Sequence, residues 1–271
     1  LFKYIRMNKK FLVIGNPIEH SLSPKLHNYW IKKNNIKALY EKKLLKEEEI
    51  EKLILEIKEE KIHGVNITIP FKKKVIPFLD LLTDEASKSQ SVNTIYKIKD
   101  KIIGDNTDIE GFKVALEKTN QIIKDKTVLI IGAGGVVPSI IIALKKLKIK
   151  KIFITNRTEA KAVEMRSSFP ELGIVDWGKM INFDIIINAT SIGLNEKDKI
   201  KLDYENISKN KFFYDIIYNP EETDFLKKGK KFGARVENGK TMFVHQAQKA
   251  FFIWHGILPE IDKETFNLLR V

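Results

Sequence analysis

The stretch Val128-Leu129-Ile130-Ile131-Gly132-Ala133-Gly134-Gly135-Val136-Val137 decides the fold prediction for this 271-residue chain. Its four leading apolar residues predict a buried strand, and the glycines predict a tight turn into a helix over residues 139–147. Backbone N–H groups at such a helix start can approach a pyrophosphate. Val137 stands where a third glycine is usual. We predict a dinucleotide-binding turn, with an ordinary strand–helix connection as the alternative.

The sequence on the C-terminal side of this turn continues the alternation of strands and helices. Strands are predicted over residues 151–155, 185–188, 212–216 and 234–236, and helices over 159–167 and 223–231. This order is typical of a doubly wound, parallel α/β sheet. The segment Asn188–Gly193 leaves one strand at its carboxyl end, where such folds place their ligand-binding loops.

The end of the second strand indicates which dinucleotide is bound. An NAD-binding domain usually has an acidic residue here, about 20 residues after the glycines, to bind the ribose 2′-hydroxyl. This chain has Asn156-Arg157-Thr158 instead. A guanidinium and a hydroxyl suit a 2′-phosphate, so the sequence predicts NADP. The alternative is that Thr158 caps the next helix and Arg157 lies on the surface.

The N-terminal half also alternates strands and helices. Ser23-Pro24 predicts a helix with Ser23 as its N-cap. The other expected elements are strands over residues 11–15, 39–45 and 64–69, helices over 47–60, 75–82 and 109–118, and a hairpin of 92–98 with 102–104. Helices are expected again over 240–257 and 262–269. We predict a mixed α/β domain over 7–107, a Rossmann-like domain over 108–238, C-terminal helices over 239–271 that return to the first domain, and a cleft between the two domains.

Residues 65–72 predict a substrate site at the end of a strand. Asn66 and Thr68 are two residues apart and should share one side, while Val65, Ile67 and Ile69 point to the other. A turn at the following proline directs Lys72. The alternative is an edge strand followed by a solvated lysine cluster at residues 72–74.

Composition narrows the function classes. The net charge is +13, but only five of the 48 basic residues are arginine and the lysines are scattered, which disfavours nucleic-acid binding. The chain has no cysteine, so disulfides and cysteine-ligated zinc are excluded and a cytoplasmic location is expected. No apolar run approaches the roughly 20 residues that span a bilayer. The five histidines show no metal-ligand spacing. Residues 1–6, before Met7, are too short for a secretory signal, and we expect them to lie outside the fold.

Three ordered groups of residues resemble the shikimate dehydrogenase family. The first comprises residues 15–24 (GNPIEHSLSP), 65–72 (VNITIPFK) and 91–94 (SVNT). The second is 104–108 (GDNTD), and the third is the cofactor set followed by 215–220 (DIIYNP) and 242–246 (MFVHQ). The resemblance implies reversible NADPH-dependent reduction of 3-dehydroshikimate to shikimate, in the pathway to aromatic amino acids. The expected partners are this small molecule and NADP, in a monomer or homodimer.

The resemblance also implies the site residues. Ser21 and Ser23 would hold the substrate carboxylate, and Lys72 and Asp108 would be the catalytic pair. The remaining substrate contacts would be Asn66, Thr68, Asn93, Asp108, Tyr218 and Gln246. The cofactor contacts would be Asp84, Gly132, Ala133, Gly134, Gly135, Val136, Asn156, Arg157, Thr158, Lys161, Thr190, Ile216, Gly239 and Met242.

Three positions depart from the family pattern, and two other functions stay open. Thr241 stands where glycine is common, Val137 where a small residue is usual, and Lys161 where arginine is usual. One alternative function is a quinate/shikimate dehydrogenase with relaxed use of NAD and NADP. The other is a dinucleotide-binding regulatory or nucleic-acid-binding protein that has lost catalysis.

Overall fold

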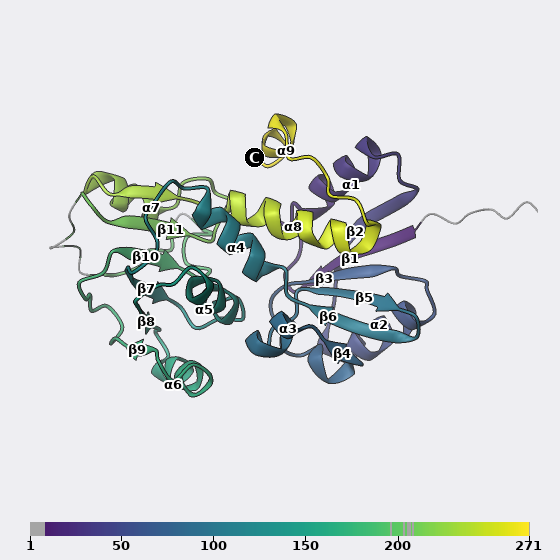
Figure 1. Ribbon diagram of the computed structural model, residues 1–271, viewed down its shortest axis with the longest axis horizontal. Helices are drawn as coiled ribbons and strands as arrows, with labels where there is room; N and C mark the ends of the chain where they lie inside the picture. The colour runs from purple at the N-terminus through teal and green to yellow at the C-terminus, as the bar shows by residue number, and fades with distance from the viewer. Residues whose placement is uncertain (1–8, 196, 203, 205–206, 208, 271) are drawn as a thin grey trace, which may run out of the picture. The chain divides into compact units, whose positions relative to one another are not determined.

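The computed structural model of the chain describes residues 9–195, 197–202, 204, 207 and 209–270, so the expectation for residues 1–6 lies outside the described part. Two compact units make up this part. Unit 1 contains the described residues up to Thr107 together with Gln246–Leu269, and unit 2 contains Asp108–His245 and Arg270. Figure 1 colours the sheet of unit 1 purple to blue and that of unit 2 teal to green.

Unit 1 is built on a six-stranded mixed sheet in the order β2-β1-β3-β5-β6-β4. Strands β1, β2 and β3 pair in parallel, whereas β5 runs antiparallel to both β3 and β6. The strands are β1 (Lys9–Gly15), β2 (Ala38–Leu44), β3 (Gly64–Ile67), β4 (Leu81–Leu82), β5 (Thr94–Ile98) and β6 (Lys101–Asp105). The helices are α1 (Ser23–Lys33), η1 (Glu47–Glu49), α2 (Ile50–Lys58), η2 (Ile76–Phe78), α3 (Asp84–Ser89), α8 (Lys240–His255) and α9 (Lys263–Asn267), of which α8 begins in unit 2.

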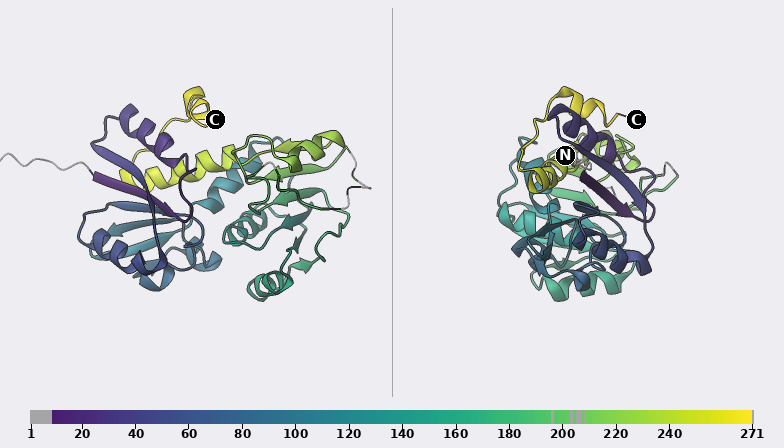
Figure 2. Two further views of the ribbon diagram at one scale, coloured as in Figure 1. Left: turned by 180° about the vertical axis from the view of Figure 1, so that it is seen from behind. Right: turned by 90° about the vertical axis from the view of Figure 1, so that its right-hand side faces the viewer.

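The two faces of the unit 1 sheet have different cores. Val65 and Ile67 belong to an apolar cluster with residues of α2. On the other face, Phe11 contacts Trp254 of α8 at 5.1 Å between ring centroids. A Cβ on Gly64 would lie 2.3 Å from the Trp254 indole nitrogen, so only glycine allows this contact. Both views of Figure 2 show α1 and α2 on opposite sides of this sheet.

Unit 2 has the doubly wound architecture that the sequence predicts. Its six strands are all parallel, in the order β12-β11-β10-β7-β8-β9. Residues of α4 and α5 pack on one face of the sheet and residues of α7 on the other. The elements are α4 (Asp108–Glu117), β7 (Thr127–Ile131), α5 (Val137–Lys146), β8 (Lys151–Thr155), α6 (Glu159–Ser168), β9 (Gly173–Ile174), β10 (Ile185–Asn188), β11 (Phe212–Asp215), α7 (Asp224–Lys231) and β12 (Arg235–Glu237).

Two local predictions are wrong, for backbone reasons. Ser23 is the first residue of α1 and not its N-cap, because Leu22 before it already has helical dihedral angles and no side chain caps the helix. Residues 75–82 do not form one helix. The short turn η2, which contains Pro77, ends at Phe78 because Leu79 has extended dihedral angles (φ −100°, ψ 146°), and β4 follows and pairs with β6.

The strand that carries Asn66 ends earlier than predicted. β3 stops at Ile67, and the Phe71 N–H donates to the Thr68 carbonyl at 3.0 Å, which closes a turn directly after it. Ile69 lies beyond the end of β3 and is 60% exposed, whereas Val65 and Ile67 are buried, so the prediction that these three residues share one side of a strand is wrong for Ile69. Helix α3 and strand β9 were not predicted from the sequence, although Thr83 stands at the N-cap position of α3 and accepts from the Ala86 N–H.

Candidate functional site

The predicted substrate residues of unit 1 follow neighbouring parallel strands. The loop with Ser21 follows β1, and the turn with Thr68 follows β3, which pairs with β1. A Cβ on Gly15 would lie 2.5 Å from the Thr68 methyl carbon, and the Asn16 N–H donates to the Ile69 carbonyl at 3.0 Å. The two segments therefore touch at the carboxyl edge of the sheet.

Ser21 and Ser23 lie at the N-terminus of α1. The Ser23 N–H donates to the Ser21 hydroxyl at 3.4 Å, and Ser23 itself is buried. No side chain caps this helix, and no acidic residue lies in its first turn. The helix dipole and the two hydroxyls together suit a carboxylate.

Asn66 is buried and makes three side-chain hydrogen bonds. Its amide nitrogen donates to the Asn93 carbonyl at 3.0 Å and to the Thr94 hydroxyl at 3.1 Å. Its amide oxygen accepts from the Tyr40 hydroxyl at 2.7 Å. The side chain is thus bonded to β2 and β5 at the same time.

Asn93 continues this network. Its amide oxygen accepts from the Thr107 N–H at 2.8 Å and from the Thr94 hydroxyl at 3.0 Å. Its amide nitrogen lies 2.9 Å from the Thr107 hydroxyl and 3.5 Å from the Gln246 amide oxygen. The structure therefore brings the buried Asn66 and Asn93 and the half-buried Gln246 into one polar network in unit 1.

Lys72 differs from its two neighbouring lysines. Its carbonyl accepts from the Val92 N–H at 2.9 Å, which holds the turn next to Asn93, and its side chain is half-buried. Lys73 and Lys74 are exposed, and Lys74 pairs with Glu47, as the solvated alternative expects for them. Asp108 is buried at the start of α4 in unit 2, and its pairing with Lys72 stays a prediction.

The glycine-rich turn of unit 2 is shaped for an anionic group. Gly132 has φ = +112°, and a Cβ on it would lie 2.8 Å from the Thr190 methyl carbon, so this turn lies against the Thr190 loop. Gly134 and Gly135 are exposed, and α5 has neither a capping side chain nor an acidic residue in its first turn. Val137 is fully buried in the core, so its side chain points away from the solvent. These features fit a pyrophosphate at the start of α5.

The predicted 2′-phosphate residues follow β8. The side chains of Arg157, Thr158 and Lys161 are exposed. The Asn156 amide nitrogen donates to the Thr158 carbonyl at 2.7 Å. Thr158 occupies the N-cap position of α6, but its side chain makes no capping hydrogen bond. A guanidinium, an ammonium and a hydroxyl together suit a phosphate dianion.

A buried hydrogen-bond network joins the loop after β10 to the loop after β11. The Asp215 carboxylate accepts from the Asn188 amide at 3.1 Å, the Ile217 N–H at 3.0 Å and the Thr223 hydroxyl at 2.6 Å. The Asn188 amide oxygen in turn accepts from the Thr190 hydroxyl at 2.7 Å. Burial raises the pKa of Asp215 to about 6, and the three hydrogen bonds oppose that rise.

The last predicted cofactor residues lie near this network or in unit 1. A Cβ on Gly239 would lie 2.0 Å from the Ile216 carbonyl oxygen, and Met242 is buried. Tyr218 stacks on Phe243 at 4.4 Å between ring centroids. Asp84 is exposed in unit 1, where it pairs with Lys88, and its contact with a cofactor stays a prediction.

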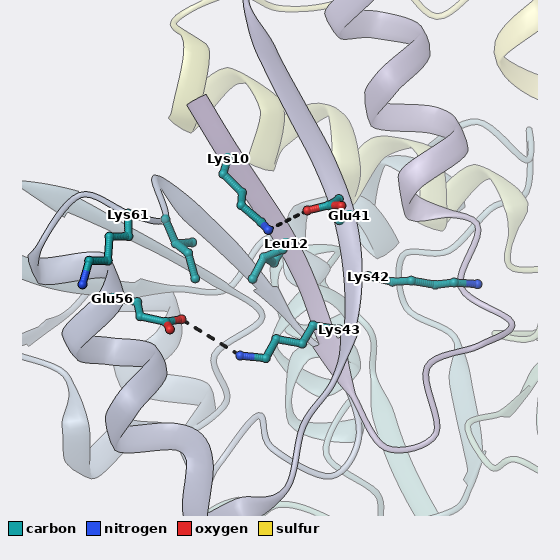
Figure 3. Close-up of a pocket in the computed structure, with 8 residues that line it drawn as sticks. Lys10, Leu12, Glu41, Lys42, Lys43, Glu56 and Lys61 are labelled. Carbon is teal, nitrogen blue, oxygen red and sulfur yellow. Dashed lines mark ion pairs between the residues drawn. The ribbon is translucent and has the colours of Figure 1, made fainter. Parts of the chain in front are cut away.

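Two hollows of the described part of the chain lie away from the predicted site residues. One of about 470 Å³ opens beside β1 and β2 and is lined by four lysines, Glu41, Glu56, Leu12 and Ile62 (Figure 3). Lys10 pairs with Glu41 at 2.7 Å and Lys43 with Glu56 at 4.0 Å, so these cations are neutralised. Another, of about 390 Å³, lies around α7 and β12. Neither contains a predicted site residue, and the polar networks are the better guide to the site.

Several members of the polar networks have no individual signal in the sequence. Tyr40, Thr94 and Asp215 contact predicted site residues or their loops, but only the strand register brings them there. Thr94 and Asp215 lie in segments that carry the family resemblance, residues 91–94 and 215–220, and this is the signal that could have identified them. Among the described residues, no group of three or more His, Asp or Glu side chains could hold a metal ion. No helix in the same part of the chain has the length and apolar character needed to cross a membrane.

Comparisons with known proteins agree on one family. The family model described as "Shikimate dehydrogenase substrate binding domain" matches residues 13–95, and "Shikimate / quinate 5-dehydrogenase" matches residues 113–223. A "Shikimate dehydrogenase (NADP(+))" from Pelagibacter ubique (strain HTCC1062) is 68% identical over 265 residues, covering 98% of this chain and 100% of that protein.

Solved structures of shikimate dehydrogenases are also similar to this chain. The shikimate dehydrogenase of Aquifex aeolicus has a TM-score of 0.89 to this chain and 35% identity, covering 98% of this chain and 99% of that one. The shikimate 5-dehydrogenase of Thermus thermophilus, solved in complex with NADP(H) and shikimate, has a TM-score of 0.86 and 29% identity. That alignment covers 96% of this chain and 97% of the other.

Proposed function

We propose a function from one premise: this chain belongs to the shikimate dehydrogenase family. It is an NADP-dependent oxidoreductase that catalyses the reversible reduction of 3-dehydroshikimate to shikimate. The observation that carries the proposal for this chain is the polar network of Asn66, Asn93 and Gln246 at the carboxyl edge of the unit 1 sheet. A cluster of oriented amides suits a substrate with several ring hydroxyls. We place the enzyme in the cytoplasm, which a cysteine-free chain allows, as a monomer or homodimer.

Substrate orientation follows from the charge distribution of unit 1. The carboxylate binds Ser21 and Ser23 at the N-terminus of α1, where the helix dipole favours an anion. The ring hydroxyls and the carbonyl face Asn66, Asn93 and the neighbouring polar groups. Thr68, Tyr218 and Gln246 complete this set. Binding both ends of the ring fixes the position of the carbon that is oxidised or reduced.

The cofactor residues divide by the part of NADP that they contact. Residues 132–136, at the start of α5, would hold the pyrophosphate, because this helix end has neither a capping side chain nor an acidic residue in its first turn. Arg157, Thr158 and Lys161, with Asn156 beside them, would bind the 2′-phosphate. NADPH, when bound, supplies the hydride. The remaining contacts are Asp84, Thr190, Ile216, Gly239 and Met242.

Lys72 transfers the proton, and Asp108 assists it. Reduction of a ketone builds negative charge on its oxygen, which needs a proton donor within hydrogen-bond reach. Lys72 donates that proton, and it accepts one back when shikimate is oxidised. Asp108 binds the neighbouring hydroxyl and orients the Lys72 ammonium. The turn that carries Lys72 is held to Val92, so the donor has a fixed origin beside Asn93.

A second candidate is a quinate/shikimate dehydrogenase with relaxed cofactor use. The match to a family model that names both substrates favours it, as does Lys161, which supplies charge without the bidentate geometry of arginine. The two candidates differ in cofactor and substrate selectivity.

One kinetic comparison tests both candidates. The purified protein is given shikimate or quinate with NADP⁺ or NAD⁺, and NADPH or NADH formation is followed by absorbance. The proposal predicts the highest kcat/KM with shikimate and NADP⁺. Equal values for both substrates and both cofactors would favour the second candidate. No turnover with any pair, together with DNA binding that persists at physiological salt, would favour a regulatory protein.

A further inference from the structure

The Asn66 side chain has no amide hydrogen left for a ligand. A side-chain amide has two N–H donors. Asn66 uses one on the Asn93 carbonyl at 3.0 Å and the other on the Thr94 hydroxyl at 3.1 Å. The amide oxygen accepts from the Tyr40 hydroxyl at 2.7 Å and keeps a second lone pair. A group that binds Asn66 in this arrangement must therefore donate a hydrogen to it.

The surroundings of Asn66 exclude the flipped amide. The Asn93 partner is a backbone carbonyl, which can only accept. A flip would place the Asn66 amide oxygen against that carbonyl oxygen, and two acceptors repel. The amide nitrogen must therefore face Asn93, and the amide oxygen must face Tyr40.

Tyr40 is held by α1. Strand β2 lies at the edge of the sheet, and the Asn28 side chain bonds both backbone groups of Tyr40, donating to its carbonyl at 2.8 Å and accepting from its N–H at 3.0 Å. The His27 ring stacks on the phenol ring at 4.1 Å between centroids and an angle of 4°. Burial lowers the pKa of His27 to about 3, so this ring is neutral at physiological pH.

Tyr40 on β2 and Asn66 on β3 are separated by strand β1, so only a long side chain with a hydrogen-bond donor at its tip can join them. Strand β1 lies between β2 and β3, so the two backbones are about 9–10 Å apart at roughly 4.8 Å per strand. Tyr40 pairs with Phe11 of β1, and Asn66 pairs with Val13, two residues further along. The phenol crosses β1 diagonally on the face that carries Asn66.

We propose that Tyr40 is a positioning residue, which orients the Asn66 side chain so that its amide oxygen faces the substrate as a hydrogen-bond acceptor. The substrate group that binds Asn66 must then be a hydroxyl and not a keto oxygen. The inference rests on the proposed function, because Asn66 is taken there as a substrate contact. Tyr40 does not touch the substrate. It acts through Asn66, and its removal weakens substrate binding more than turnover.

A double-mutant cycle tests whether Tyr40 acts through Asn66. It compares the wild type, Tyr40→Phe, Asn66→Ala and the double variant, and Tyr96→Phe is added as the matched control. The Tyr96 hydroxyl is on β5 in the same unit and makes no hydrogen bond within the described residues. Steady-state kinetics are measured with shikimate and NADP⁺. We expect Tyr40→Phe to raise KM for shikimate about 10-fold, the loss of about one buried hydrogen bond, with kcat and KM for NADP⁺ nearly unchanged. Tyr96→Phe should match the wild type.

The double variant separates positioning from packing. If Tyr40 acts through Asn66, adding Tyr40→Phe to Asn66→Ala changes KM no further. Additive effects on KM, or an unchanged KM in Tyr40→Phe, would overturn the proposal. Thermal unfolding of the same four proteins gives the Tyr40–Asn66 coupling without substrate. If the wild type fails to turn over shikimate, the proposed function fails, while an absent coupling in unfolding separately refutes the link between the two residues.

Discussion

Replacing Asp215 by asparagine should change the pH dependence of stability. Asp215 is fully buried, and desolvation raises its pKa from 3.8 to about 6. Asparagine has nearly the same shape as the protonated carboxyl group. Its oxygen accepts from the Asn188 amide and the Ile217 N–H, and its NH₂ donates to the Thr223 hydroxyl. Asp215→Asn therefore mimics the protonated protein at every pH.

The direction and size of the effect follow from proton linkage. Because the folded-state pKa is raised, the folded protein binds this proton more tightly than the unfolded chain does. The stability that the proton contributes is present below about pH 4 and is lost as the pH rises to about 6. A rise from 3.8 to about 6 corresponds to roughly 3 kcal/mol of unfolding free energy. The variant should thus equal the wild type near pH 4 and exceed it by about 3 kcal/mol above pH 6.

Urea unfolding across this pH range measures the difference. Thr223→Ser is the matched control, because it keeps the hydroxyl bonded to Asp215 and removes one buried methyl group. It should lower the unfolding free energy by about 1 kcal/mol at every pH. A stability difference between Asp215→Asn and the wild type that stays constant with pH would refute the reasoning.

Two further predictions concern cofactor selectivity and packing. Arg157→Ala should raise KM for NADP⁺ by about 10-fold or more with KM for NAD⁺ unchanged, because the guanidinium serves the 2′-phosphate; equal changes for both cofactors in steady-state kinetics would contradict this. Gly64→Ala should destabilise the protein by about 1–3 kcal/mol in urea unfolding, because a Cβ would lie 2.3 Å from the Trp254 ring nitrogen. Gly134→Ala, where nothing lies within 4 Å of a Cβ, serves as its control and should unfold near the wild-type midpoint.

The fold was predictable where the chain carries long apolar runs. Buried strands of parallel sheets are apolar on both faces, and residues 151–155 and 185–188 match β8 and β10 residue for residue. The predictions of helix ends failed where the backbone dihedral angles of a single residue decide where a helix begins or stops. Leu22 is helical, which moves Ser23 out of the cap position, and Leu79 is extended, which ends the helical turn at Phe78. Neither effect appears in the apolar pattern.

The sequence motifs predicted individual site residues, but not the hydrogen bonds that join them to residues elsewhere in the chain. Asn66 and Asn93 stand in segments that carry the family resemblance, so the sequence singled them out. Tyr40 was not predicted, because its contact with Asn66 depends on the register of β2 against β1 and of β1 against β3. The role of Asp215 depends in the same way on partners from β10 and from the residue before α7. Such contacts between distant residues are fixed by the fold.

The turnover number of Lys72→Ala tests the central claim most directly. The chain offers Lys73→Ala as a matched control, because this neighbouring lysine is exposed. With shikimate and NADP⁺ saturating, Lys72 as proton donor and acceptor predicts a kcat lower by about 10²–10⁴-fold in Lys72→Ala, and a wild-type kcat in Lys73→Ala. A Lys72→Ala protein that keeps the wild-type kcat and changes only KM would contradict the account, since Lys72 would then bind substrate without moving the proton.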